Sequence, residues 1–346
     1  MTHWADLLRE LTAVPGISGS EETIARHLAS RLKAFSTSVS IDPLYNVSAR
    51  FGKGTDYGIA ICAHIDTIGM MVKRINMDET LGIVRIGGIN YKAIPGTAVR
   101  VHTDEGDVQG IVGVRSAHQA RPGDEAVRAD EEIYIDVGRK AVHVDITSPI
   151  TYAPHFVELN GGVIASPYLD NRAGCAVLLA LAERLKAEPP PFKVHLIGTV
   201  QEETNAVGAQ SILNTLRPSA AIFIDGTVSY DTPETRGRGE TVLGGGAVLT
   251  SFLYISGIGS WHAHPVLRRQ LKKTAHEHGV PFQQDAVHGL MSDSRVAIPL
   301  GIPSAVIGIP MRGKHSAAEM LQTSDLDAVL ALLTHALADE KFRITH

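Results

Sequence analysis

The chain has 346 residues, with 32 Lys and Arg against 37 Asp and Glu and a formal net charge of −5. This mild acidity argues against a general binder of nucleic acid or of acidic membranes, which needs an excess of basic residues. The presence of only two cysteines excludes a disulfide-stapled scaffold and a four-cysteine zinc site. Acidic side chains interrupt the N-terminal region where a signal peptide needs apolar residues, and the apolar run 176–182 is too short to cross a bilayer. We therefore expect a cytoplasmic protein.

Strand-like and helical patterns alternate in residues 1–66 and again in residues 163–346. Ser18 and Glu21 have the spacing of a capping box, and apolar residues at helical spacing follow them through Leu32. Such alternation predicts a three-layer α/β/α domain. The predicted strands are 57–63, 193–200, 220–224 and 304–309, and the later predicted helices are 172–186, 206–216, 265–279 and 323–339.

Residues 67–162 have a different pattern, in which Gly- and Asp-rich turns separate short strand-like runs and no helical period is sustained. Short strands at regular spacing are typical of a small barrel or sandwich. We therefore expect an all-β domain inserted into the α/β domain. Its predicted strands are 69–75, 82–86, 98–102, 108–114 and 132–137.

Polar residues that can bind metal or transfer protons lie next to the predicted strands of the α/β domain. Ligands of open α/β sheets bind beyond the carboxyl ends of the strands, so these residues should converge on one edge. Each has an ordinary explanation by itself, because an Asp is often a turn residue and most of the 16 histidines must be structural. That explanation has to be repeated at every strand end, whereas one metal site accounts for all of them. The residues are His64, Asp66, Asp170, Glu202, Glu203, Asp225 and His315.

The residue types fit a site for two metal ions. Two His, two terminal carboxylates and one bridging Asp would give each ion two ligands of its own and one shared ligand. Nitrogen and oxygen donors without a thiolate suit Zn²⁺, Co²⁺ or Mn²⁺. The backbone can turn at the strand end, so that one of Glu202 and Glu203 is a ligand and the other a general base. Asp66 follows His64 by two residues and is expected to accept the second N–H of its imidazole.

Taken together, the motifs resemble metallopeptidase family 42, the glutamyl and tetrahedral aminopeptidases, some members of which are labelled endoglucanases. The resemblance extends from residue 15 to the last helix, and the motifs follow the family's order. They are Ala63-His-Ile-Asp-Thr-Ile-Gly69, Leu169-Asp-Asn-Arg-Ala-Gly-Cys175, Val200-Gln-Glu-Glu203, Ile224-Asp225 and Pro310-Met-Arg-Gly-Lys-His-Ser316.

The resemblance implies a fold and a set of residue roles. It implies a three-layer, phosphorylase/hydrolase-like metallopeptidase domain formed by residues 1–66 and 163–346. The insertion at 67–162 would be a PDZ-like barrel that builds homo-oligomers, from dimers to tetrahedral dodecamers. His64 and Asp225 would hold one divalent ion, Glu203 and His315 the other, Asp170 would bridge them, Glu202 would be the base and Asp66 would orient His64. A cis peptide bond between Asp170 and Asn171 is also implied.

Three positions depart from the family's pattern. Thr67 stands where the family usually has Glu, and Asn171 stands where it has a second Asp. The family often has Arg-Tyr before the final His, where this chain has Arg312-Gly-Lys314. None of these changes removes a proposed ligand, but the last lies beside the substrate cleft.

Some remaining signals are less specific. His262 and His264 match no family ligand; their spacing suits a metal pair on a strand, but we favour a loop lining the substrate groove or a surface turn. Residues 289–294 predict a helix start capped by Ser292 or Asp293 near the cleft. Cys62 and Cys175 are predicted to be buried.

The leading functional hypothesis is a dinuclear metal-dependent aminopeptidase that acts on peptides. The altered loop before His315 keeps open a deacylase acting on a small acylated amino acid or dipeptide. An endoglucanase is disfavoured, because neighbouring carboxylates are poorly placed to flank a sugar bond. A non-catalytic assembly protein would require a missing ligand or base, and none is missing.

Overall fold

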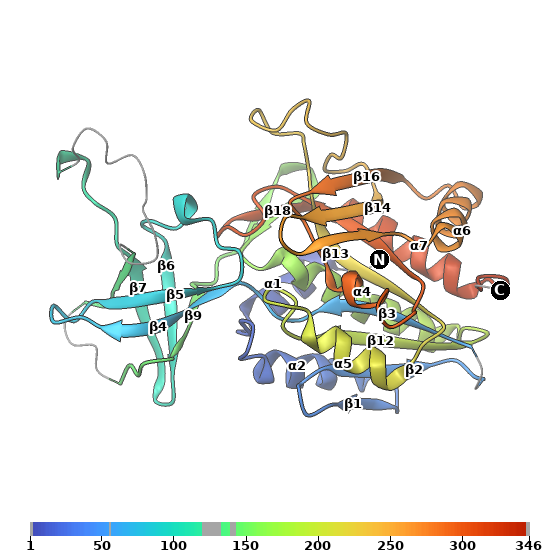
Figure 1. Cartoon of the computed structure of the whole chain (residues 1–346), viewed down its shortest axis with the longest axis horizontal. Coiled ribbons are helices and arrows are strands. Elements are labelled where there is room, and N and C mark those ends of the chain that lie inside the picture. Colours follow the sequence, from blue (N-terminus) through green and yellow to red (C-terminus); the bar gives the residue numbers. More distant parts are fainter. Residues whose placement is uncertain (1–2, 55–56, 120–132, 139–142, 344–346) are drawn as a thin grey trace.

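The protein has an α/β fold in two parts, a large sheet with its helices and a small β-barrel at the left of Figure 1. The structure is a computed structural model that describes residues 3–54, 57–119, 133–138 and 143–343. The predicted α/β class and the predicted barrel are both confirmed. Among the described residues, no helix has the length and apolar character needed to cross a membrane.

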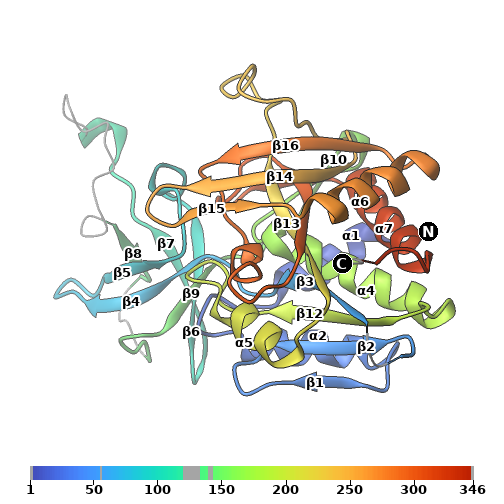
Figure 2. The same ribbon diagram turned by 45° about the vertical axis from the view of Figure 1, so that its right-hand side comes forward.

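The large sheet positions the residues of interest through parallel strands in its middle. β12 pairs with β3, β3 with β13 and β13 with β17, each time in parallel. Thr199 is paired with His64 and Phe223 with Cys62, which brings Asp225 level with His64. Figure 2 shows the strands of the sheet one above another, from β16 near the top to β1 at the bottom. In order, its strands are β1 (Val39–Ile41), β2 (Val47–Phe51), β12 (Lys193–Thr199), β3 (Gly58–His64), β13 (Ala220–Val228), β17 (Ser304–Met311), β14 (Ala247–Ile255) and β15 (Gly259–His262), with β16 (Phe282–His288) paired to β14.

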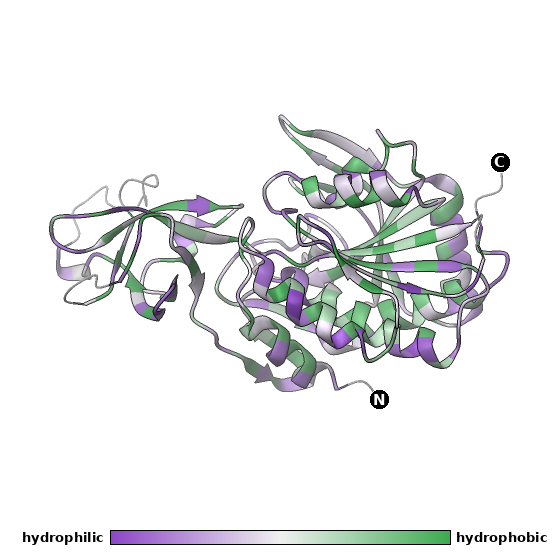
Figure 3. Ribbon diagram, turned by 90° about the horizontal axis from the view of Figure 1, so that it is seen from below, coloured by the Kyte–Doolittle hydropathy of each residue, from purple (hydrophilic) through white to green (hydrophobic). Residues whose placement is uncertain are grey.

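Both faces of this sheet are buried by apolar side chains, as parallel strands require. Ile61 and Ala63 pack in one core with five helices, and Cys62 packs in a second core with α5 and the short η4. In Figure 3, green, hydrophobic residues accordingly occupy much of the strands in the middle of the sheet. The helices are α1 (Trp4–Ala13), α2 (Glu22–Leu32), α4 (Leu169–Ala187), α6 (Pro265–Glu277) and α7 (Thr323–Ala338) on the first face, with α5 (Val207–Leu216) and η4 (Asp293–Val296) on the second.

The barrel is closed by six strands around its own apolar core, which includes Met70, Val99 and Ile150. Five strands occur where the sequence predicts them, although Glu132, the first residue of one predicted strand, lies outside the described residues. The sixth, β9, was not predicted. In barrel order the strands are β4 (Gly69–Ile75), β5 (Leu81–Ile86), β8 (Tyr134–Asp136), β7 (Gly106–Val112), β6 (Ala98–Thr103) and β9 (Pro149–Tyr152).

A third, small sheet connects the chain that leaves the barrel to the chain that follows His315. It contains β10 (Val157–Leu159), β11 (Val163–Ser166) and β18 (Glu319–Gln322), all antiparallel. Ser166 is paired with Glu319. This pairing brings the start of α4 and the start of β18 together. The barrel strands lie between Gly69 and Tyr152, and the domain bounds at 67 and 162 remain a prediction.

The predicted capping box is wrong. α2 begins at Glu22, its N-terminus receives no side-chain cap from any residue that the structure describes, and the Ser18 hydroxyl donates to Oδ2 of Asp66 at 2.6 Å instead. The Glu21 carboxylate accepts from the backbone N–H groups of Gly19 and Gln201. Both side chains therefore support the sheet edge rather than the helix. By contrast, Ser292 caps η4 as predicted, since its hydroxyl accepts from the N–H of Ser294.

Candidate metal centre

All seven predicted site residues lie at or next to the carboxyl edge of the large sheet. His64 is the last residue of β3, and Asp225 lies in β13. Asp170 lies at the start of α4, where the Asp170–Asn171 peptide bond is cis as the family resemblance implied. His315 follows β17 in a left-handed conformation with φ of 64°. The sheet topology thus gathers residues that are distant in sequence.

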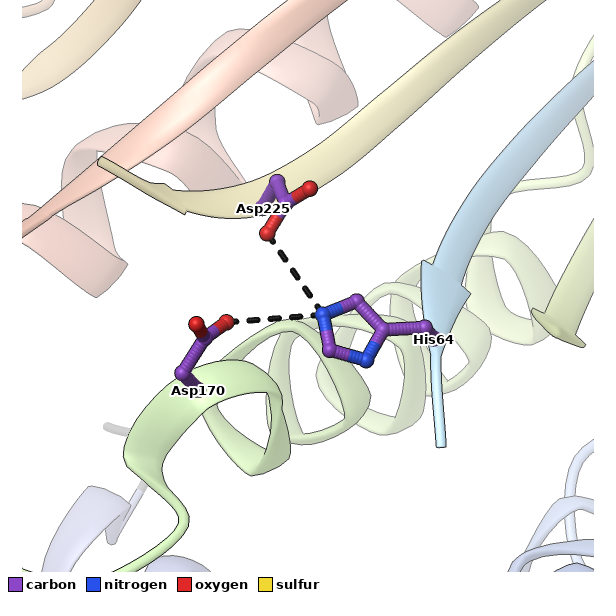
Figure 4. Close-up of side chains that lie close together, drawn as sticks. All are labelled: His64, Asp170 and Asp225. Atoms are coloured by element: carbon purple, nitrogen blue, oxygen red, sulfur yellow. Dashed lines mark ion pairs between the residues drawn. The ribbon is translucent and has the colours of Figure 1, made fainter. Parts of the chain in front are cut away.

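One group of three donors consists of His64, Asp170 and Asp225. Nε2 of His64 lies 3.4 Å from Oδ1 of Asp170 and 3.5 Å from Oδ1 of Asp225. Figure 4 shows both carboxylates turned toward this nitrogen. All three side chains are buried. The three atoms can therefore face one common point.

A second group contains His315, and it shares Asp170 with the first. Nε2 of His315 lies 3.4 Å from Oδ2 of Asp170 and 3.3 Å from Oε2 of Glu203. The two oxygens of one carboxylate therefore face two different histidines. Both groups have ligand atoms close enough together to hold a metal ion.

The spacing of these atoms fits metal ligands better than hydrogen-bonded partners. N–H···O hydrogen bonds are about 2.7–3.2 Å long, so the four distances exceed that range. Donors about 2.1 Å from a tetrahedral ion lie about 3.4 Å from one another. In addition, Oδ1 of Asp170 and Oδ1 of Asp225, which face His64, are buried with no hydrogen-bond partner among the described residues, and the same holds for Oε1 of Glu203, whose other oxygen faces His315. Because unpaired buried oxygens are costly, a bound cation would stabilise this arrangement.

Glu202 lies beside the first group. β12 ends at Thr199, and Gln201 adopts a left-handed conformation with φ of 57°, so the backbone turns sharply before the two glutamates. Oε2 of Glu202 is 3.9 Å from Nε2 of His64. Burial, together with the carboxylates of Asp225 and Glu203, raises the pKa of Glu202 well above its usual value. A buried carboxyl with a raised pKa can hold and release a proton near neutral pH.

Asp66 contacts its neighbours differently from the prediction. The carboxylate lies 3.6 Å from Nδ1 of His64, too far for a hydrogen bond, and the backbone carbonyl of Asp66 lies 3.1 Å from that nitrogen. The carboxylate instead accepts from the backbone N–H groups of Glu202 and Glu203. Asp66 therefore orients the imidazole through its backbone and orients the two glutamates through its side chain.

Glu319 is a buried residue of this site that sequence reasoning missed. Its Oε2 accepts from the backbone N–H of Asp170 and its Oε1 from that of His315, each at 2.8 Å. Burial and the nearby Asp170 carboxylate raise the pKa of Glu319 to about 8. The one feature of the sequence that could have indicated a role for Glu319 is its position four residues after His315. Glu319 fixes the backbone of two residues in the second group.

Asp293 and Lys314 also approach the site from outside the predicted set. The Asp293 carboxylate accepts from the Thr199 hydroxyl, and burial raises its pKa to about 7. Nζ of Lys314 lies 2.9 Å from Oδ2 of Asp170. The sequence predicted that both residues lie near the cleft, but it did not predict their contacts with Thr199 and Asp170.

The two histidines of the His262-Ala-His264 segment lie outside these groups. His262 ends β15, is exposed and packs against the Phe252 ring at 4.9 Å between centroids. His264 immediately precedes α6. The metal-competent groups found among the described residues include neither histidine. Cys62 and Cys175 are buried free thiols, as predicted.

Comparisons with known proteins agree with this geometry. A family model described as M42 glutamyl aminopeptidase matches residues 46–332. The relative SgcX of Escherichia coli (strain K12) is named as an aminopeptidase. It is 33% identical to this chain over 334 residues, which cover 92% of this chain and 89% of SgcX. Aminopeptidase APDkam598 from the archaeon Desulfurococcus kamchatkensis has a TM-score of 0.90 at 28% identity, covering 97% of this chain and 94% of its own. The Pyrococcus horikoshii TET1 peptidase, which can assemble into a tetrahedron or a large octahedral shell, has a TM-score of 0.86 at 26% identity, covering 96% and 99%.

A metal-dependent hydrolase is therefore the class of protein that the fold and the site define. The chain belongs to the M42 glutamyl aminopeptidase family. It is a metallo-aminopeptidase, and its family implies the use of divalent metal.

Replacing Glu319 by Ala should weaken metal binding. The change leaves the backbone N–H groups of Asp170 and His315 without their acceptor, so both ligands lose their fixed position. We expect affinity for Zn²⁺ to fall by about 10- to 100-fold, as is typical when a partner of a ligand is removed. Competition with a chromophoric chelator measures this, and Glu340→Ala, at an exposed carboxylate, is the control. Unchanged affinity in Glu319→Ala would contradict the role given to this residue.

Proposed function

We propose that the protein is a dinuclear metal-dependent aminopeptidase that removes N-terminal residues from peptides. The observation that carries this proposal is the shared Asp170 carboxylate, which has one oxygen toward His64 and the other toward His315. A single ion would need only one of the two groups. The buried carboxylate oxygens of Asp170, Asp225 and Glu203 that have no hydrogen-bond partner among the described residues also support bound cations.

The proposed ligand sets follow from these contacts. His64, Asp225 and Asp170 would hold one ion, and His315, Glu203 and Asp170 the other. We propose Zn²⁺, with Co²⁺ and Mn²⁺ as the alternatives that these donors also accept. When bound, such a pair of ions polarises a substrate carbonyl and lowers the pKa of water toward neutrality.

We assign the proton transfers to Glu202. Its Oε2 would take a proton from the attacking water and then deliver it to the nitrogen of the leaving amine. The assignment rests on the distance of 3.9 Å to His64 and on the burial that raises the pKa of Glu202. Asp66 would act as a positioning residue, because it holds the backbone N–H groups of Glu202 and Glu203.

The barrel is proposed to be a PDZ-like oligomerisation domain, inserted at residues 67–162 into a three-layer α/β/α domain. Large apolar side chains of this part remain exposed in the single chain, including Met77, Ile111, Val114 and Ile146. Ile111 and Val114 line one surface pocket of the barrel together with the exposed Tyr134, and exposed apolar side chains gathered in this way indicate an interaction surface. We therefore propose a homo-oligomer, in the range from a dimer to a tetrahedral dodecamer.

A deacylase is the second candidate function. The observation that favours it is the position of Lys314, whose ammonium group lies against the shared Asp170 carboxylate. The loop before His315 therefore brings a positive charge to the site, where the family often has Arg-Tyr. An endoglucanase is less favoured, because the carboxylates gather around histidines instead of facing each other across a cleft.

Glu202→Gln should separate catalysis from metal binding. The variant keeps both proposed ligand sets but has no group to accept the proton, so we expect unchanged metal content and turnover reduced by about 100- to 10,000-fold. His64→Ala should instead lose metal, as measured by elemental analysis after dialysis. Glu183→Gln, at an exposed position, is the control. Full turnover in Glu202→Gln would overturn the assignment of the base.

Metal removal and a substrate panel should distinguish the candidate reactions. After treatment with a strong chelator, we expect aminoacyl chromogenic substrates not to be cleaved until Zn²⁺, Co²⁺ or Mn²⁺ is restored. N-acylated dipeptides should remain intact throughout, because the proposed reaction needs a free amino terminus. Cleavage of the acylated compounds alone would favour the deacylase, and glucan hydrolysis that survives chelation would favour the endoglucanase.

A further inference from the structure

Lys314 places a positive charge directly against the proposed bridging ligand. It occurs in the loop that departs from the family's usual Arg-Tyr pattern, one residue before His315. Its side chain is only 11% exposed. Nζ lies 2.9 Å from Oδ2 of Asp170 and donates to the backbone carbonyl of Gly226, also at 2.9 Å. The ammonium group is therefore held in place by two contacts.

This ammonium group stands beside the second metal group, not inside it. Among the described residues, Asp170 is the one carboxylate within 4.0 Å of Nζ, whereas Nε2 of His315 approaches both Asp170 and Glu203. An ion in the second group would contact Glu203 as well. Each carboxylate oxygen offers two lone pairs, so Oδ2 can accept from Lys314 and still bind a metal. Lysine and metal can thus be present together.

The charge acts unequally on the two proposed ions. Lys314 contacts Oδ2, the oxygen that faces His315, whereas Oδ1 faces His64 and Asp225. A cation on Oδ2 draws electron density from that oxygen and repels a divalent ion bound to it. An ion held by His64 and Asp225 would face the other oxygen, Oδ1, and would be less affected.

We propose that Lys314 is a positioning residue that acts through Asp170 to weaken binding of the ion held by His315 and Glu203. The protein would then bind one ion tightly and the second more weakly, so that occupancy of the second site follows the concentration of free metal. This inference rests on the proposed two-ion site. It gives the Gly313-Lys314 loop a role in metal binding in addition to any role in the substrate cleft.

Removal of the charge should strengthen metal binding, which a merely structural lysine would not do. Loss of a structural contact would lower affinity, whereas loss of a repulsive charge should raise it. We expect Lys314→Met to raise the affinity of the weaker site by about tenfold or more and to change the tighter site much less. Lys314→Gln removes the charge but keeps a donor for the Gly226 carbonyl, so it serves if the Met variant does not fold.

The experiment is a calorimetric titration of the metal-free full chain with Zn²⁺ and with Co²⁺, in the presence of a competing chelator. Co²⁺ absorption reports the environment of each site independently of activity. Lys272→Met, at an exposed position on α6, is the matched control and should bind as the wild type does. Equal or lower affinity at the weaker site in both Lys314 variants would overturn the inference. Failure of the wild type to bind two ions would instead overturn the proposed function.

Discussion

The arrangement of the site depends on one buried carboxylate, that of Asp170, with a histidine at each of its oxygens. Asp225 and Glu203 complete the two groups. Without cations, these acids repel one another and leave buried oxygens unpaired, which costs free energy. The fold resists this repulsion with backbone contacts: Glu319 holds Asp170 and His315, and Asp66 holds the two neighbouring glutamates. These contacts hold the acids and histidines close together, in positions from which they can bind cations.

The parallel strands explain why residues so distant in sequence meet. Their register brings His64 level with Asp225 and beside the end of β12, and the turn at Gln201 then directs the glutamates back to the edge. The small sheet adds the remaining contribution, because its pairing of Ser166 with Glu319 brings the start of α4 to the loop that carries His315. The large sheet and the small one are therefore both needed to assemble the two groups.

Much of the candidate site could be predicted from the sequence, because ligands of open α/β sheets bind beyond the carboxyl ends of the strands. The rule located the seven residues, and the barrel followed from its short strands. It could not locate Glu319, because its two hydrogen bonds go to backbone N–H groups that no motif encodes. The capping-box prediction failed for a related reason: Ser18 has the spacing of a helix cap, but the long-range contact with Asp66 takes its hydroxyl. Outer strands such as β14 and β16 were not predicted; β16 has three polar residues in succession, Gln283, Gln284 and Asp285, and so lacks the apolar run that marks a buried strand.

The central claim, two cations on either side of Asp170, is tested most directly by anomalous diffraction from a crystal grown with excess Zn²⁺. The account predicts two peaks per chain, one among His64, Asp225 and Asp170 and the other among His315, Glu203 and Asp170. A single peak, or peaks bound to other residues while these side chains point apart, would contradict it.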